Sequence, residues 1–206
     1  MIIGLTGSHR SGKSTLAKAV AEDLGLTFVP QSFGEAARRH GVDAVAPMTL
    51  TDRLHIQQRI LIDHIDMVRS NQEVIIVDRT PIDYLAYLLG EFHMQSHMAA
   101  DSRVFELVRI YKRQVIQAVD TFYDKLFVLQ PLESYAAEPG KPAFNVAYQD
   151  HIQLLVEGAI VNLEGAVRIH WISNTDFEER RTAMTELIVK RLDEVHTLRR
   201  SSAHLH

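Results

Sequence analysis

One segment near the amino terminus constrains the fold of this chain more than any other. It reads Gly7-Ser8-His9-Arg10-Ser11-Gly12-Lys13-Ser14, followed by Thr15, and it matches the pattern G-x-x-x-x-G-K-[ST] at every fixed position. The apolar run before it, residues 1–6, is typical of a buried parallel strand. After it, residues 16–24 carry apolar side chains at helical spacing, and Gly25 stands where a helix C-cap glycine is expected. Strand, glycine-rich loop and helix therefore come in the order that a phosphate-binding loop requires.

The residue types in this segment predict how a nucleotide is held. Gly7 and Gly12 allow backbone conformations in which successive N–H groups point into one concavity, and the helix that follows adds the positive end of its dipole. Lys13 is expected to reach the β- and γ-phosphates of a nucleoside triphosphate. Ser14 is expected to bind Mg²⁺ through its hydroxyl, and Thr15 to donate to the α-phosphate. The predicted nucleotide site thus comprises every residue of the loop, from Gly7 to Thr15.

Length and composition limit the classes of protein that this chain can belong to. With 206 residues it is most simply one domain, predicted over residues 1–197 and followed by a polar tail, residues 198–206. A net charge of -4 argues against broad non-specific adhesion to nucleic acid but leaves room for a local basic groove. Cysteine is absent, so disulfides and thiolate zinc sites are excluded, as in many cytosolic proteins. We find no signal peptide and no apolar run of membrane-spanning length, and we expect a cytoplasmic protein without a membrane partner.

Apolar runs alternate with helical patterns along the rest of the chain. Further strands are expected at residues 26–29, 73–78, 125–129 and 167–172, with a last helix over about 176–197. Strands separated by helices predict an α/β fold with a five-stranded parallel sheet and helices on both faces. Ligands of such sheets bind beyond the carboxyl ends of the strands. The loops that follow the strands are therefore expected to surround one cleft.

The third expected strand ends in Asp78-Arg79, which would face the same cleft as the phosphate-binding loop. Asp78 can hold Mg²⁺ directly or through water, or it can accept a proton from an attacking hydroxyl. Arg79 offers a planar set of donors suited to phosphate oxygens. Asp83 either caps a helix that starts near Pro81 or contacts the phosphoryl acceptor. The sequence leaves both alternatives open for Asp78 and both for Asp83.

Together these motifs resemble those of the P-loop nucleoside and nucleotide kinases, and particularly the small bacteriophage-type deoxynucleotide kinases. Residues 32–41 and 140–152 resemble the segments that follow the second and fourth strands of that group. The resemblance implies a three-layer P-loop kinase fold and an enzyme that transfers the γ-phosphate of ATP, with Mg²⁺, to a deoxynucleoside or deoxynucleotide. Some members are implied to phosphorylate 5-hydroxymethyluracil within DNA, which gives an alternative acceptor. If the chain is phage-encoded, its location would be the host cytoplasm.

The sequence departs from the common kinase pattern in the region of the acceptor. Gln31 stands where nucleoside kinases often carry a catalytic glutamate, and Glu35 is expected to substitute for it. Phe33 either stacks on a base or belongs to the core, and Arg38 either meets acceptor phosphates or a DNA backbone, or faces solvent. The predicted acceptor pocket contains Gln31, Ser32, Phe33, Arg38 and Asp83.

A loop over about residues 131–146 is longer than most connections and is predicted to act as a lid. It would bring Lys141 to the transferred phosphate, where a single amine replaces the several arginines of the common pattern. Apolar helices such as residues 53–69 make a homodimer possible. Zinc is set aside for His93 and His97, since the motif lacks its glutamate and third ligand.

A nucleotide hydrolase or switch is the third functional class. Against it, the sequence contains no N-K-x-D segment that would read guanine, and the third strand does not end in an Asp-Glu pair that would orient a water molecule. Arg180 and Arg181, at the start of the last helix, are placed near the adenine of a bound nucleotide.

Overall fold

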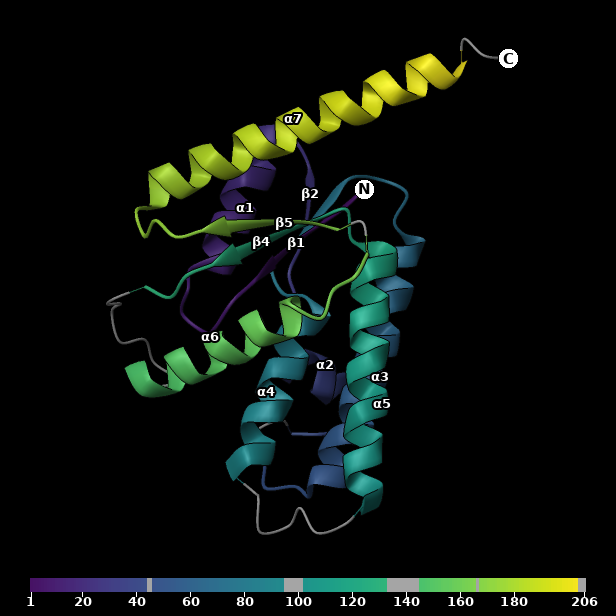
Figure 1. Ribbon diagram of the computed structural model, residues 1–206, viewed down its shortest axis with the longest axis vertical. Coiled ribbons are helices and arrows are strands. Elements are labelled where there is room, and N and C mark those ends of the chain that lie inside the picture. Colours follow the sequence, from purple (N-terminus) through teal and green to yellow (C-terminus); the bar gives the residue numbers. More distant parts are fainter. Residues whose placement is uncertain (44–45, 95–101, 133–144, 166, 204–206) are drawn as a thin grey trace.

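The computed structural model describes residues 1–43, 46–94, 102–132, 145–165 and 167–203 (Figure 1). Strands and helices alternate along most of the chain. The strands are β1 Ile2–Thr6, β2 Thr27–Val29, β3 Ile75–Val77, β4 Lys125–Leu129 and β5 Arg168–Ile172. The helices are α1 Lys13–Leu24, α2 Phe33–Arg39, α3 Leu50–Ser70, α4 Pro81–Met94, α5 Ser102–Phe122, α6 Val146–Ile160 and α7 Phe177–Ala203.

The strands form one parallel sheet in the order β2-β3-β1-β4-β5. The central strand β1 pairs on both sides, with Ile3 opposite Ile76 of β3 and Gly4 opposite Leu126 of β4. The predicted five-stranded parallel sheet is thereby confirmed. Because all strands are parallel, their carboxyl ends meet at one edge, where the loop after β1 lies between those after β3 and β4.

Helices cover both faces of the sheet (Figure 1). On one face Ile3 and Leu5 of β1 pack with Leu16 of α1 and Ile188 of α7. On the other, Ile2 belongs to a larger cluster that includes residues of α3, α4, α5 and α6. The alternation along β1 follows the two-residue period of a strand and yields three layers.

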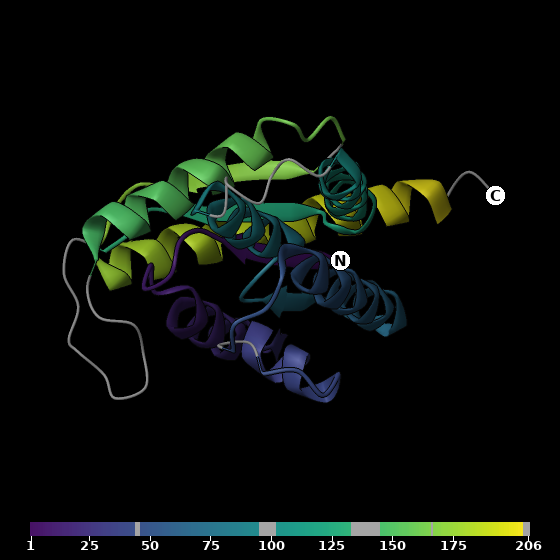
Figure 2. The ribbon, with the colours of Figure 1, turned by 90° about the horizontal axis from the view of Figure 1, so that it is seen from below.

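A smaller cluster lies beside the sheet, where α2 packs against α3 and α4 (Figure 2). Ala36 and Ala37 of α2 meet Ile56 and Ile60 of α3 and Tyr84 of α4. This cluster fixes the segment that follows β2 next to the start of α4.

Two boundaries differ from the sequence-based expectation. The third strand is shorter than predicted, because it pairs only over Ile75–Val77 and Asp78 already belongs to the loop. The last helix continues to Ala203, so it takes in much of the predicted tail, and no glycine or proline interrupts residues 177–203. It extends past the sheet at its carboxyl end (Figure 1). No helix within the described ranges is long and apolar enough to cross a membrane.

Candidate active site

The phosphate-binding loop connects the central strand β1 to α1. Its backbone takes left-handed conformations at Arg10 and Gly12, with φ of 59° and 81°, and φ of Gly7 is 147°. Such angles favour glycine, which explains Gly7 and Gly12 at these positions. Gly12 is also the N-cap of α1 and makes no side-chain hydrogen bond to it. No capping side chain therefore covers the first turn of α1, as an anion-binding helix start requires.

Lys13 is held inside the loop. Its Nζ donates to the carbonyls of Gly7 and Ser8 at 2.7 Å each and to Ser11 Oγ at 3.2 Å. The side chain is 6% exposed, and burial lowers the pKa of Lys13 to about 8 although Asp83 opposes the shift. The ammonium group is thus fixed beneath the loop and poorly solvated, which strengthens its attraction to an anion.

Asp83 lies directly under this loop and not in an acceptor pocket. Its carboxylate accepts from the N–H groups of Gly7 at 3.2 Å and Thr80 at 2.8 Å, and it lies 3.9 Å from Lys13 Nζ. Since Thr80 precedes α4, the bond to its N–H is that of a capping box, the first of the two predicted roles. With an exposed fraction of 0%, Asp83 offers no surface to an acceptor, so the predicted acceptor contact is corrected. Burial raises the pKa of Asp83, while Lys13 and Arg79 oppose the rise.

A cavity of about 620 Å³ opens at the carboxyl ends of β1, β2 and β3. Its lining includes Ser14 and Thr15, both exposed, as well as Asp78 and Glu35. Asp78 is 4% exposed, and its Oδ1 accepts from the N–H of Gln31 at 2.6 Å. The structure therefore brings together the hydroxyl and the carboxylate that were predicted as Mg²⁺ ligands.

The donor set of this cavity fits Mg²⁺ better than a metal that needs a cage of protein ligands. The described residues contain no cluster of three or more His, Asp or Glu side chains able to hold a metal. Mg²⁺ commonly takes only one or two protein ligands and completes its shell with phosphate oxygens and water. Ser14 and Asp78 supply that number. The region of His97 and the side chain of His93 lie outside the described part.

The remaining predicted acceptor residues lie around the start of α2. Ser32 is the N-cap of α2 and accepts from the Glu35 N–H, while Gln31 Oε1 accepts from the Tyr84 hydroxyl at 3.4 Å. The Phe33 ring lies 6.2 Å from that of Tyr84 and is partly buried in the α2–α3–α4 cluster. Arg38 is exposed, because the alanines of α2 take its buried face. Phe33 thus makes the core contact, whereas the exposure of Arg38 is compatible with both roles predicted for it.

Arg79 lies between the loop and α4, with its guanidinium 5.9 Å from the ring centre of Tyr87. Lys141 and most of the predicted lid fall outside the described residues. Arg181 forms a two-pronged ion pair with Asp23 on the outside of α1, at 2.6 Å per bond.

Side chains of α6 that the sequence analysis did not single out support the phosphate-binding loop. Gln153 Oε1 accepts from the Ser8 N–H at 2.9 Å, and Gln149 Nε2 donates to the His9 carbonyl at 3.0 Å. Gln153 Nε2 donates in turn to Glu157, which also accepts from Gln130. The sequence signal was a row of polar residues four apart, 149, 153 and 157, on a helix that also carries an apolar face.

Arg180, predicted near the adenine, joins three loops. Its guanidinium donates to the carbonyls of Ser11 at 2.7 Å and Gln130 at 2.8 Å, and also to that of Asn174. These carbonyls lie in the loops after β1, β4 and β5. With an exposed fraction of 2%, Arg180 is a structural donor at the base of the site.

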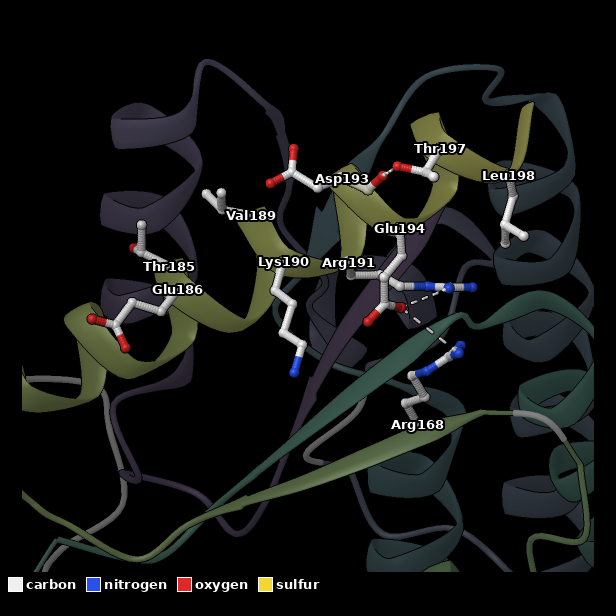
Figure 3. A pocket seen from close by; sticks show the side chains of 10 residues that line it. All are labelled: Arg168, Thr185, Glu186, Val189, Lys190, Arg191, Asp193, Glu194, Thr197 and Leu198. Atoms are coloured by element: carbon white, nitrogen blue, oxygen red, sulfur yellow. Dashed lines mark hydrogen bonds and ion pairs between the residues drawn. The ribbon is translucent and has the colours of Figure 1, made fainter. Parts of the chain in front are cut away.

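A second cavity, of about 920 Å³, lies between α7 and β5 (Figure 3). Glu194 accepts from Arg191 at 3.1 Å there and lies 3.8 Å from Arg168. Lys190 points from the helix toward the strands in the same view. No residue of the predicted site lines this cavity, so it is separate from the predicted nucleotide site.

A parallel sheet whose central strand leads through a G-x-x-x-x-G-K-S loop into a helix defines a P-loop nucleotide-binding fold. Residues 2–180 match the family described as AAA domain, and the chain belongs to that family. Among curated proteins, none matches the sequence of this chain.

Solved structures of nucleoside and nucleotide kinases share the fold. Deoxyadenosine kinase from M. mycoides with bound dATP superposes with a TM-score of 0.61 at 16% identity, covering 94% of this chain and 99% of its own. Thymidylate kinase from Candida albicans gives 0.60 at 16% identity, covering 92% and 91%. YorR protein from Bacillus subtilis, in complex with phosphorylated GDP, gives 0.56 at 14% identity, covering 96% and 98%. The predicted P-loop kinase fold is confirmed.

Proposed function

We propose that this protein is a kinase that transfers the γ-phosphate of ATP to a deoxynucleoside or deoxynucleotide. The observation that carries the proposal is the cavity shared by Ser14, Asp78 and Glu35, which adjoins the loop that encloses Lys13. Phosphoryl transfer needs a clamp for the phosphate charge and a place for the acceptor next to it. The matched deoxyadenosine and thymidylate kinases support an acceptor of the same chemical class.

In this proposal the loop binds the triphosphate through its N–H groups, and Lys13 and Arg79 neutralise the charge of the phosphates. Ser14 and Asp78 would hold Mg²⁺, which supplies further positive charge at the phosphate oxygens. Asp78 is already engaged by the Gln31 N–H, whereas Glu35 is exposed in the same cavity. We therefore assign acceptance of the acceptor's proton to Glu35.

A small acceptor is favoured over DNA because the net charge is -4. The exposed arginines of α2, Arg38 and Arg39, are the feature that supports 5-hydroxymethyluracil in DNA as the alternative acceptor. Closure by the segment with Lys141, homodimerisation and a cytoplasmic location remain predictions from the sequence.

The test is incubation with γ-labelled ATP and a panel of acceptors. The panel contains deoxynucleosides, their monophosphates, and DNA with or without hydroxymethylated pyrimidines. We expect label on a nucleoside or monophosphate, and a decrease of about 100-fold or more for Lys13→Ala because the phosphate clamp is lost. Label only on hydroxymethylated DNA would replace the small acceptor by the DNA alternative. Release of labelled phosphate with every acceptor left unlabelled would indicate a hydrolase and contradict the proposal.

A further inference from the structure

The imidazole of His9 is a shielded polar group of the phosphate-binding loop whose role the proposed function does not explain. Both ring nitrogens are shielded from solvent, and neither has a hydrogen-bond partner among the described residues. Buried polar groups are nearly always paired, so an unpaired imidazole in a ligand-binding loop calls for a functional explanation. A structural role alone would be served by an apolar ring.

The ring is held in place from two sides. Its centre lies 5.2 Å from that of Tyr148 on α6, at an angle of 38°. The His9 carbonyl accepts from Gln149 Nε2 at 3.0 Å, and the preceding Ser8 N–H donates to Gln153. Position and orientation of the imidazole are therefore set before any ligand binds.

Cationic groups surround this ring. Burial lowers the pKa of His9, and the charges of Lys13, Arg10 and Arg79 lower it further. The ring of Tyr148 packs against this imidazole, and burial raises the pKa of the Tyr148 phenol. A donor ring among cations is electrostatically unfavourable by itself but favourable next to an anion.

We propose that the His9 imidazole donates a hydrogen bond to a phosphoryl oxygen bound at the loop, as a second side-chain ligand beside Lys13. The inference rests on the proposed function, since it requires that the loop binds a nucleotide phosphate. The phosphoryl group belongs either to the end of ATP or to a phosphorylated acceptor. A phosphate that partly neutralises Lys13, Arg10 and Arg79 also favours the protonated imidazole, which then makes a charge-assisted bond.

Two substitutions separate the hydrogen bond from the packing of the ring. His9→Phe keeps a ring against Tyr148 but removes both donors, and His9→Gln restores an amide donor. For the ligand whose phosphate meets His9, ATP or a phosphorylated acceptor, we expect the phenylalanine variant to bind about tenfold more weakly than the wild type, and the glutamine variant to recover most of the loss. Equal thermal midpoints of the variants show that the fold is intact.

Comparison of ligands identifies the source of the phosphate. Weaker binding of ATP with unchanged binding of ADP places His9 at the terminal phosphate. A raised KM for a deoxynucleoside monophosphate, with an unchanged KM for the deoxynucleoside and unchanged ATP binding, places it at the acceptor. Either result supports the proposal.

The pH dependence of ATP affinity separates the hydrogen bond from packing, because a role in packing alone would not change with pH. The difference in ATP affinity between wild type and His9→Phe should increase as the pH falls and shrink as the pH rises, because the imidazole loses its proton at higher pH. The titration of ATP itself contributes to both proteins and cancels in this difference. In NMR spectra, the His9 imidazole signal of the wild type is identified by its absence from the spectrum of His9→Gln. The pKa of His9 measured from this signal should be higher with saturating ATP than without ATP.

If His9→Phe binds every ligand as the wild type does, and the His9 pKa does not rise, the inference is wrong. The proposed function survives that result provided that Lys13→Ala loses ATP binding. If the wild-type protein binds no ATP, both are wrong.

Discussion

Lys13 and His64 are both buried bases, and burial lowers the pKa of each for the same reason: a charge in the interior loses its hydration. Lys13 has carbonyl oxygens and Asp83 within reach, so its pKa falls only to about 8. His64 has the Tyr123 hydroxyl at 2.6 Å and no described acid that raises its pKa, which burial lowers to about 4. Lys13 can thus bind an anion, whereas His64 stays neutral in the core.

At the residue scale, His64 should make the protein sensitive to acid. Its pKa in the folded state lies below its ordinary value of 6.5, so its contribution is fully present above that pH and is lost as the pH falls toward 4. The loss approaches about 3 kcal/mol, since one pKa unit corresponds to about 1.4 kcal/mol. Urea unfolding at several pH values measures it. His64→Phe should lose less stability than the wild type between about pH 7 and pH 4.5.

The matched control is His55→Gln, because His55 is exposed on the same helix. It should follow the wild-type curve. Parallel curves for the wild type and His64→Phe would show that His64 does not carry the acid sensitivity.

At the scale of elements, α6 holds the phosphate-binding loop from one side and α4 from beneath. Gln153 of α6 pairs with Ser8, and Asp83 of α4 pairs with Gly7. The two helices also pack against each other: Ile152 of α6 would lie 2.9 Å from a Cβ at Gly90 of α4. The shape of the loop therefore depends on side chains more than 70 residues away in the chain.

Gln153→Leu should leave the buried Ser8 N–H without a partner. We expect a loss of about 1–2 kcal/mol in the free energy of unfolding and a decrease in ATP affinity of about tenfold. Urea unfolding and an ATP titration measure the two effects. Leu154→Gln, on the exposed side of the same helix, is the control and should change neither. Unchanged ATP affinity in Gln153→Leu would mean that the loop keeps its shape without α6.

At the scale of the whole molecule, the site is held together where helices from both faces reach the carboxyl edge of the sheet. Arg180 of α7 contributes from one face by binding the carbonyls of Ser11, Gln130 and Asn174. The helices of the other face contribute Asp83 and Gln153. Distortion of either helix layer should therefore weaken the binding of the phosphates.

Arg180→Met should remove the donors to all three carbonyls while keeping much of the apolar stem. We expect the free energy of unfolding to fall by about 2–3 kcal/mol and ATP to bind more weakly, as measured by urea unfolding and titration. Arg181→Met changes the neighbouring residue, whose partner is Asp23 on the surface, and should leave both quantities unchanged. Equal effects of the two substitutions would contradict the assigned role of Arg180.

The sequence was informative wherever function depends on local order. The strand–loop–helix order around Lys13 and the apolar runs of the other strands were sufficient to predict five parallel strands. The order of those strands was out of reach, because it depends on which strands pair across the sheet. The end of α7 was missed since its last turns are polar and, as Leu198 shows with 64% exposure, have little apolar surface to bury.

The site was predictable in its loop and much less so in its support. Ser14, Asp78 and Glu35 were expected in one cleft because they follow parallel strands or belong to the loop. Asp83 was assigned partly to the acceptor, since a carboxylate near a strand end gives no sign from sequence that a backbone loop will cover it. Gln153 was missed for a related reason: a polar residue on a helix is usually solvated.

Gly4 shows how a position remote from any ligand can govern the site. A Cβ there would lie 2.6 Å from the side chains of both Thr80 and Tyr123. Only a bare backbone at the middle of β1 lets the start of α4 come so near, and that approach is what seats Asp83 under Gly7 and Lys13. A single methyl group at residue 4 would therefore push the start of α4 away from the sheet. Asp83 would then no longer hold Gly7 and Lys13 in place, although every group that touches a nucleotide would still be present.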